Sequence, residues 1–465
     1  MIDESDSGML SPGWANTNVN TIVGDRAWIE AALEVEAALA RCQGELGIIP
    51  REAAATIEAV AGSLRIDPRT LAVGVAETSN PAITLVQELQ RAVERDSPGA
   101  SDHVHLGATS QDVLDSATML VCRRALFELD ATLSRARANA AQLIARHGDA
   151  PMAGRTVTQH AVPMTFGVKV AAWLNALVDA QTELGRLLDD GLPLSLAGAS
   201  GTLAAYAAYG SRATNGPFDP FTLVDAVAEE LALDAHYQPW HTVRTPIARI
   251  ASTLTLVSGA LGKIASDVHV MSRTEIAEVV EGLGDGGGIS SSMPQKLNPV
   301  RTVLVLSAAR QVPSLALVLH QAMLAEDERS AGAWQSEWQP LRDALRLVLG
   351  SASHLDELLA TLRVDEQRMR ANLDLTGPAI VSERLNVALT PLIGKLQAKH
   401  VLRRLLLDGS ATGEGLVSAL QGELTALGVD PGDLDLERLL DPADYLGASA
   451  EIARRALLRS AAFDD

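Results

Sequence analysis

The chain has 465 residues, which is long for a single core and predicts two or three domains. Its 38 basic and 58 acidic side chains give a formal net charge of −20, which argues against nucleic-acid partners and anionic membrane surfaces. The two cysteines fall inside helical patterns, the N-terminus has no basic leader, and no long apolar run lacks charges, so we expect a cytoplasmic protein without a membrane span.

Apolar residues spaced three and four apart predict helices over most of the chain. In chain order, the long helices are expected over residues 25–46, 112–146, 165–189, 246–282, 298–328 and 340–362. Shorter helices are expected from about residue 372 onward, broken by glycines and a proline. Because aromatic residues make up only 3% and β-branched alternation is rare, the sequence predicts an all-α fold.

Helices of this length cannot bury their apolar stripes within a small globule. The helix over 112–146 alone would be roughly 50 Å long at 1.5 Å per residue. We therefore expect an elongated helical bundle that continues across subunits, and hence a homo-oligomer. The predicted domains are an N-terminal helical domain (1–105), a central long-helix bundle (106–362) and a C-terminal helical domain (363–465).

The central domain contains a loop, residues 282–299, that we call the signature loop. From residue 286 onward it reads Gly286-Gly287-Gly288-Ile289-Ser290-Ser291-Ser292-Met293-Pro294-Gln295-Lys296-Leu297-Asn298-Pro299. A serine becomes a useful base when positive charge and backbone N–H groups stabilise its alkoxide, and Lys296 and Asn298 supply a charge and further polar groups. This set suits removal of a proton beside a carboxylate, because the dianionic enediolate that results needs such donors. A flexible linker is the alternative, but a linker does not require this order of residues.

The order Ser-Ser-x-Met-Pro-x-Lys-x-Asn-Pro resembles the signature loop of the fumarase/aspartase superfamily. Two further segments resemble motifs of the same family in the same order, residues 105–112 (His-Leu-Gly-Ala-Thr-Ser-Gln-Asp) and 154–163 (Gly-Arg-Thr-Val-Thr-Gln-His-Ala-Val-Pro). Pro239-Trp240-His241-Thr242 and Glu328-Arg329 make the chain similar to the branch of bacterial 3-carboxy-cis,cis-muconate cycloisomerases, over residues 10–455. The resemblance implies a three-domain, mostly helical subunit and a homotetramer, with each active site built from three subunits and no metal or cofactor.

The same resemblance makes Ser290 the catalytic base, with Lys296 and Asn298 as ligands of a substrate carboxylate. The further residues expected to line or bind the substrate are Thr109, Ser110, Arg155, Thr156, Gln159, His160, His241, Arg244, Ser291, Met293 and Arg329. Hydroxyls and amides ahead of long helices bind carboxylates, and arginines bind them bidentately. The alternative for each arginine is an ion-paired or solvated role, and a single histidine among apolar helical residues is more often structural.

Positions 289 and 157 depart from the family pattern, and Asp327 stands where the cycloisomerases tend to have a histidine before Glu-Arg. Ile289 stands where the family normally has glycine, and isoleucine adopts a positive φ only at a cost. Val157 stands where members with amine or purine leaving groups commonly have a histidine as general acid, and where the cycloisomerases usually have tryptophan. Because an amine leaving group needs a proton that valine cannot give, Val157 argues against adenylosuccinate and argininosuccinate as substrates.

These observations predict first a lyase that performs a serine-initiated anti β-elimination on a substituted succinate. Nitrosuccinate is the named substrate, with fumarate and nitrous acid as products. The alternative is a 3-carboxy-cis,cis-muconate cycloisomerase, which adds a carboxylate within one molecule, and a third possibility is a catalytically silent structural member. The partners predicted are a small dicarboxylate or tricarboxylate and further copies of the chain.

Overall fold

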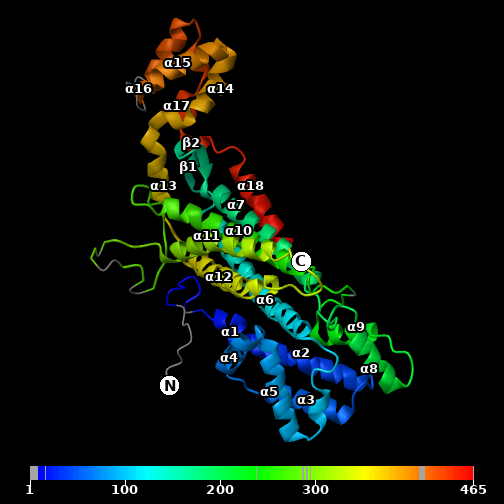
Figure 1. Ribbon diagram of the computed structural model, residues 1–465. Coiled ribbons are helices and arrows are strands. Elements are labelled where there is room, and N and C mark those ends of the chain that lie inside the picture. Colours follow the sequence, from blue (N-terminus) through cyan, green and yellow to red (C-terminus); the bar gives the residue numbers. More distant parts are fainter. Residues whose placement is uncertain are drawn as a thin grey trace. The chain divides into compact units, whose positions relative to one another are not determined.

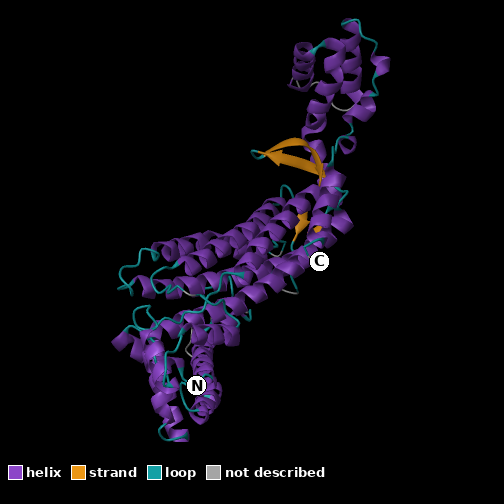
Figure 2. Cartoon of the chain, turned by 90° about the vertical axis from the view of Figure 1, so that its right-hand side faces the viewer, coloured by secondary structure: helices purple, strands orange, loops and turns teal. Residues whose placement is uncertain are grey.

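A computed structural model describes residues 9–15, 17–236, 238–284, 287–289, 292–293, 295–407 and 414–463. Helices dominate these residues, and the named strands form two short antiparallel pairs (Figure 2). The strands are β1 (Pro151–Thr156), β2 (Gln159–Thr165), β3 (Val279–Val280) and β4 (Arg363–Val364). The predicted all-α class is therefore confirmed.

Five long helices carry most of the predicted apolar stripes. They are α6 (Ser110–His147), α7 (Phe166–Asp189), α10 (Thr245–Met271), α11 (Val300–Gln321) and α12 (Ala333–Thr361). In α6, stripe residues such as Leu129, Leu133 and Leu143 are at most 1% exposed, as the helical spacing predicts.

The chain divides into two compact units, whose boundaries fall inside these five helices. Unit 1 comprises Met1–Leu133, Ala180–Gly262 and Leu304–His354, and unit 2 comprises Ser134–Asp179, Lys263–Val303 and Leu355–Asp465. The three predicted domains, with boundaries at 105/106 and 362/363, stay a prediction.

Unit 1 begins with a group of shorter helices that lie side by side (Figure 1). They are α1 (Val19–Val23), α2 (Asp25–Glu45), α3 (Arg51–Ser63), α4 (Pro68–Thr78), α5 (Pro81–Asp96) and the 3₁₀ turn η1 (Ala100–His103). Asp67 and Asn80 cap α4 and α5 with their side chains, and each helix begins with a proline, which suits a first turn. The unit also contains α8 (Ala204–Thr214) and α9 (Phe221–Leu231).

Unit 2 ends in a small helical cluster with its own core (Figure 1). The last elements of unit 2 in chain order are α13 (Glu366–Leu373), η2 (Asp374–Val381), α14 (Ser382–Ile393), α15 (Lys395–Leu407), α16 (Glu414–Ala426), η3 (Pro431–Asp433), α17 (Leu436–Leu440), η4 (Pro442–Asp444) and α18 (Ser449–Ala461). The cluster is built around α14 to α17, whereas α18 lies beside α7, where Arg459 Nη1 donates to Asn175 Oδ1 (3.0 Å) (Figure 1). The core consists mostly of leucines from α14 to α17, among them Leu385, Leu416 and Leu436.

The predicted helix ends differ most beside the signature loop. The helix expected over 246–282 ends at Met271, because the chain then turns through Ala277 at a φ of 48° into the strand β3. The helix expected over 298–328 spans only Val300–Gln321 and continues through Pro313. The helix expected over 340–362 begins earlier, at Ala333.

Two observations concern the expected cytoplasmic setting. Cys42 and Cys122 are free and buried, and burial raises the pKa of both thiols to about 12. Two described helices, α10 and α11, are long and apolar enough to cross a membrane by length and composition alone, with 50% and 33% of their most apolar windows buried. The core helices of soluble proteins meet the same criterion, so these helices do not identify a membrane protein.

Candidate active site

A wholly buried carboxylate lies in the first turn of α6. Asp112 accepts a hydrogen bond from the N–H of Thr109 (3.2 Å), as the acidic residue of a capping box does. Four more donors reach the same carboxylate, namely Ala197 N (2.9 Å), Gly198 N (3.0 Å), Tyr206 Oη (3.1 Å) and His241 Nε2 (2.9 Å). Burial and the Asp112 charge raise the pKa of the Tyr206 hydroxyl, so it stays a donor. Asp112 is therefore a fixed acceptor around which this part of unit 1 is organised.

His241 takes its orientation from that carboxylate. Because the Asp112 carboxylate accepts hydrogen bonds from all its partners, His241 Nε2 carries the hydrogen and donates it to Asp112 Oδ1. The other ring nitrogen, Nδ1, is buried and has no hydrogen-bond partner in the part of the chain that the structure describes. Buried polar atoms normally have a partner, so Nδ1 of His241 is a group that a ligand could satisfy.

Arg244, at the end of the segment before α10, is enclosed by acceptors. Its Nε and Nη2 donate to Glu337 (2.9 and 2.6 Å), and Nη1 and Nη2 donate to Asp115 (2.8 and 3.0 Å). A further bond from Nη1 to the carbonyl of Trp240 (3.2 Å) engages the last N–H, and the guanidinium also lies over the Trp240 ring. Arg244 is 2% exposed, so in this arrangement no N–H remains for a substrate carboxylate.

Arg329 is an exposed arginine that reaches the start of α6. Its Nη2 donates to Thr109 Oγ1 (2.8 Å) and to the carbonyl of Ala199 (3.3 Å), and its Nε donates to Gln111 Oε1 (3.2 Å). Ser110 follows Thr109, and its hydroxyl accepts a hydrogen bond from Asn80 Nδ2 (2.7 Å). Two predicted substrate ligands, Thr109 and Arg329, are thus in direct contact.

In unit 2, Arg155 lies on β1 and is paired. Its Nη1 and Nη2 donate to the two oxygens of Glu278 (3.0 and 2.6 Å), a carboxylate that is fully buried. Asn372 Nδ2 donates to the same Glu278 Oε1 (2.8 Å). This bidentate pair joins the hairpin to the segment before β3 and engages one edge of the guanidinium.

The turn between β1 and β2 consists of Val157 and Thr158, both in the left-handed region with φ of 48° and 71°. Val157 is 94% exposed, although a β-branched residue adopts this backbone only with strain. Thr156 and Gln159 face each other across the turn and are exposed. His160 pairs with Arg155 in the register, and burial followed by the Arg155 charge lowers the pKa of its imidazole.

The signature loop forms a narrow hairpin in its described part. The carbonyl of Gly288 accepts two hydrogen bonds from Asn298, one from the backbone N–H (2.8 Å) and one from Nδ2 (3.1 Å). Gly288 has a φ of 72°, whereas Ile289 forms an antiparallel bridge with Leu297. The positive φ thus falls on the glycine, and Ile289 occupies a bridged position that suits its β-branched side chain. Lys296 is exposed.

A buried glutamate fixes both ends of this loop. Glu281, which directly precedes the loop, accepts hydrogen bonds from the N–H groups of Arg301 (3.0 Å) and Thr302 (2.8 Å) in the first turn of α11. Arg301 Nη1 donates in return to the carbonyl of Gly282 (3.3 Å). A carboxylate at a helix N-terminus is favourable, so Glu281 holds the beginning of the loop against the helix that follows its end.

Ser290 and Ser291 lie outside the described residues. Met293, 43% exposed, accepts a backbone hydrogen bond from Lys296 N–H (3.0 Å). Sequence reasoning did not select the buried residues Gln111, Asp112, Asp115, Tyr206 and Glu278. Gln111 and Asp112 could have been selected, because both stand inside the motif over residues 105–112. Tyr206 and Glu278 stand outside the recognised motifs, so no sequence pattern pointed to them.

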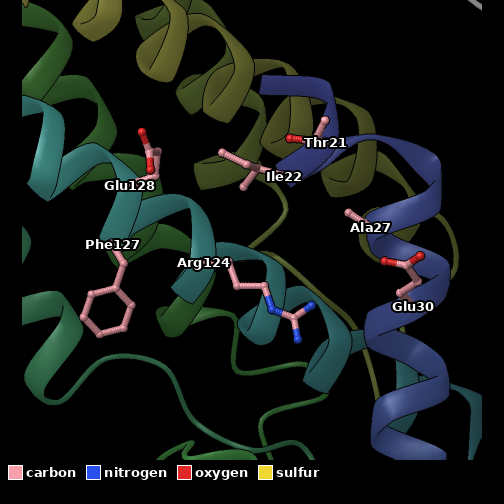
Figure 3. A pocket seen from close by; sticks show the side chains of 7 residues that line it. All are labelled: Thr21, Ile22, Ala27, Glu30, Arg124, Phe127 and Glu128. Carbon is pink, nitrogen blue, oxygen red and sulfur yellow. The ribbon is translucent and has the colours of Figure 1, made fainter. Parts of the chain in front are cut away.

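The surface pocket shown in Figure 3 is lined by other residues than the motif residues described above. Residues of α1, α2 and α6 line it, namely Thr21, Ile22, Ala27, Glu30, Arg124, Phe127 and Glu128. None of them belongs to a recognised motif, and Arg124 is already paired with Glu34. The described residues contain no group of three or more potential protein ligands for a metal ion. The motif residues of each unit therefore remain the candidates for the active site.

Comparisons with known proteins agree with the family that the sequence motifs resemble. Residues 11–314 match the family described as lyase. The chain is 47% identical over 460 residues to a nitrosuccinate lyase of Streptomyces davaonensis, which covers 97% of this chain and 94% of that protein. It is 41% identical over 439 residues to a 3-carboxy-cis,cis-muconate cycloisomerase of Pseudomonas aeruginosa, covering 94% and 93%. The crystal structure of a 3-carboxy-cis,cis-muconate lactonizing enzyme from Pseudomonas putida matches with a TM-score of 0.89 at 36% identity, covering 98% of this chain and 100% of that one.

Proposed function

Because the chain belongs to the lyase family, within the fumarase/aspartase superfamily, we propose that it eliminates a small anion from a substituted succinate and releases fumarate. Nitrosuccinate is the substrate that we propose, with nitrous acid as the second product. The observation that carries this choice is the 47% identity, over nearly the whole length, to a protein named for that reaction.

The leaving group agrees with the residue at the hairpin turn. Valine at position 157 can neither donate nor accept a proton, and its side chain is 94% exposed in the single chain. Nitrite leaves as a stable anion and needs no proton at the moment of bond cleavage, whereas an amine does. Val157 therefore supports nitrite over the amine leaving groups of other members of this superfamily.

In the proposed mechanism, the Ser290 alkoxide removes a proton from the carbon beside one carboxylate. The electron pair of that C–H bond moves into the carboxylate and gives a dianionic enediolate, which Lys296, Asn298 and loop N–H groups stabilise. The pair then returns to form the carbon–carbon double bond, and the C–N bond breaks with its electrons on nitrite. Thr109 and Arg329, which are hydrogen-bonded to each other, are proposed to bind a carboxylate.

A 3-carboxy-cis,cis-muconate cycloisomerase is the second candidate. The 41% identity to the Pseudomonas aeruginosa protein and the fold match to the lactonizing enzyme favour it. Its carboxylate addition uses the same base chemistry in reverse, and it too needs no acid at position 157. The two candidates differ in the substrate, which is a dicarboxylate with a small head group in one case and a tricarboxylic diene in the other.

We also propose that the chain assembles as a cytoplasmic homotetramer whose active sites combine residues of three copies. Support comes from apolar side chains left uncovered on unit 1, such as Leu256 on α10 (43% exposed) and Leu317 on α11 (57% exposed). Both line a surface pocket between these helices, together with Ser252, Thr255, Pro313, Ala316 and His320. Light scattering of the purified protein should give four times the chain mass of 49.0 kDa, and a monomer that is fully active would contradict this assembly.

The function is tested by supplying racemic nitrosuccinate and following fumarate and nitrite together. We expect equal release of both products, and in Ser290→Ala a loss of several orders of magnitude in turnover with the fold retained. Ser292→Ala, in the same loop and exposed, is the matched control and should stay within a few-fold of the wild type.

The possible outcomes of these assays distinguish the three candidate functions. Turnover of 3-carboxymuconate without nitrite release from nitrosuccinate would make the chain a cycloisomerase. A wild type without turnover on either compound, and indistinguishable from Ser290→Ala, would support a silent structural member. A Ser290→Ala variant within about tenfold of the wild type would remove Ser290 as the base.

A further inference from the structure

Arg329 is held by neutral groups. Its three hydrogen-bond acceptors are the Gln111 amide oxygen, the Thr109 hydroxyl and the Ala199 carbonyl, which we call the Arg329 cradle. Among the residues that the structure describes, no carboxylate bonds to this guanidinium, although the chain has 58 acidic side chains. Arg329 is exposed, so its charge is oriented and remains available to a ligand.

The amide of Gln111 has a single consistent orientation. Its Nε2 donates to Asp115 Oδ2 (3.1 Å) and to the carbonyl of His241 (2.8 Å), and both partners can only accept. The amide oxygen must therefore face Arg329 Nε. The side chain is fully buried, so the surrounding packing holds this orientation.

The two arginines beside Gln111 and Asp115 differ in their hydrogen-bond partners. Arg244 is buried and has two carboxylates, Asp115 and Glu337, as partners. Arg329 is exposed and receives an amide instead, although Gln111 is in direct contact with Asp115. A glutamate at position 111 would place a carboxylate against Arg329 Nε and cancel the charge that the cradle leaves free.

We propose that Gln111 is a positioning residue, which keeps Arg329 oriented and free of carboxylates so that its guanidinium receives a carboxylate of the substrate. The inference rests on the proposed function, in which the substrate carries at least two carboxylates. The cradle engages Nε and both hydrogens of Nη2, which leaves the Nη1 edge for the ligand. Thr109 Oγ1 accepts from Nη2 and keeps its own hydrogen, so the ligand carboxylate lies between Arg329 Nη1 and the Thr109 hydroxyl.

The test measures binding of fumarate to the full-length protein by calorimetry, which requires no turnover. Gln111→Met removes the amide at similar length, and Gln111→Glu keeps the shape but adds a charge. Because hydrogen bonds to charged groups are the stronger ones, we expect Gln111→Met to weaken fumarate binding about 10- to 100-fold, and Gln111→Glu at least as much. Gln43→Met is the matched control, since Gln43 is an equally buried glutamine of unit 1 whose side chain, among the described residues, bonds the Leu106 carbonyl (2.8 Å). Binding in this variant should stay within about twofold of the wild type.

A double-mutant cycle distinguishes positioning from a general effect on the fold. If Gln111 acts through Arg329, Gln111→Met adds no further loss of binding in an Arg329→Met background. An equal loss in both backgrounds, or wild-type binding by both Gln111 variants, overturns the proposal. If Gln111→Met does not fold, Gln111→Glu takes its place in the cycle. Equal loss of binding in both backgrounds, or wild-type binding, would again overturn the proposal.

The proposed function and this inference can fail separately. A wild type that binds fumarate with the coupling described, but does not turn over nitrosuccinate, refutes the substrate and leaves the role of Gln111 standing. The same titration with propane-1,2,3-tricarboxylate then tests the cradle with a ligand of the cycloisomerase class. A wild type that binds neither compound overturns the cradle as a carboxylate receptor.

Discussion

Gly288→Ala tests whether the described hairpin of the signature loop is the conformation needed for activity. A Cβ atom at this position would lie 2.7 Å from the carbonyl oxygen of Asn298 and 2.6 Å from Leu283 Cδ1, and the backbone has a φ of 72°. The leucine side chain can move, but the Asn298 backbone cannot shift without disturbing its two hydrogen bonds to the Gly288 carbonyl.

The magnitude follows from these contacts. A left-handed backbone costs an L-residue about 1–2 kcal/mol, and each of the two hydrogen bonds contributes about 0.5–1.5 kcal/mol. The hairpin should therefore be destabilised by about 2–5 kcal/mol, which lowers the population of the competent loop, and with it kcat/KM, about 30- to 5000-fold. Because the loop is mostly exposed, the melting temperature should change little.

Gly284→Ala is the control within the same loop. A Cβ atom at Gly284 meets nothing within 4 Å, and its backbone is not left-handed, so activity should stay within about twofold. The assay is steady-state fumarate release, with circular dichroism to follow the fold. Wild-type kcat/KM in Gly288→Ala, or an equal loss in Gly284→Ala, would refute the assignment of this hairpin to the active conformation.

Three further predictions follow from other parts of the chain. Arg244→Met leaves two buried carboxylates unpaired and should lower the free energy of unfolding by about 3–5 kcal/mol in urea titrations, whereas the exposed Arg329→Met should leave stability nearly unchanged and raise KM. Burial lowers the pKa of His105, but the charge and hydrogen bond of Glu36 raise it above its ordinary value overall, so the pair stabilises the fold fully below about pH 6.5 and loses this contribution as pH rises through the raised pKa. The gap in unfolding free energy between the wild type and His105→Asn should therefore shrink from pH 5.5 to 8.5, and a constant gap would argue against the assignment. Val157→His should give no gain in nitrite release, and a large gain on nitrosuccinate would contradict the argument about the leaving group.

The long helices could be predicted from the sequence because a three-and-four spacing has few other interpretations. The limits of α6 and α7 differ from the expected ones by two residues at most. The β1–β2 hairpin could not be predicted, because its segment mixes glycine, prolines and polar residues that hide any alternation. The end of α10 at Met271 was also missed, since the chain leaves the helix for β3, which pairs with β4 83 to 85 residues further along the chain.

The candidate site shows a second limit of sequence reasoning. The motifs selected residues that the structure does bring together, such as Thr109 and Arg329. They could not separate Arg155 and Arg244, which are bonded to carboxylates, from Arg329, which bonds to no carboxylate among the residues that the structure describes. The partners Glu278 and Glu337 lie 123 and 93 residues away along the chain, so no local pattern announces them.

Burial explains why the arginines divide in this way. A buried guanidinium such as that of Arg244 is tolerated only when carboxylates and hydrogen bonds compensate the loss of water, and this compensation removes it from ligand binding. An exposed guanidinium is solvated and needs no carboxylate, so neutral acceptors are enough to orient Arg329. The chain has a net charge of −20, so carboxylates are plentiful. The neutral surroundings of Arg329 are therefore due to which residues stand next to it, namely Gln111, Thr109 and Ala199. The buried amide of Gln111 lies beside the Asp115 carboxylate that serves Arg244. We expect Gln111→Glu to pair Arg329 with a carboxylate and so remove it from the ligand binding that we propose for it.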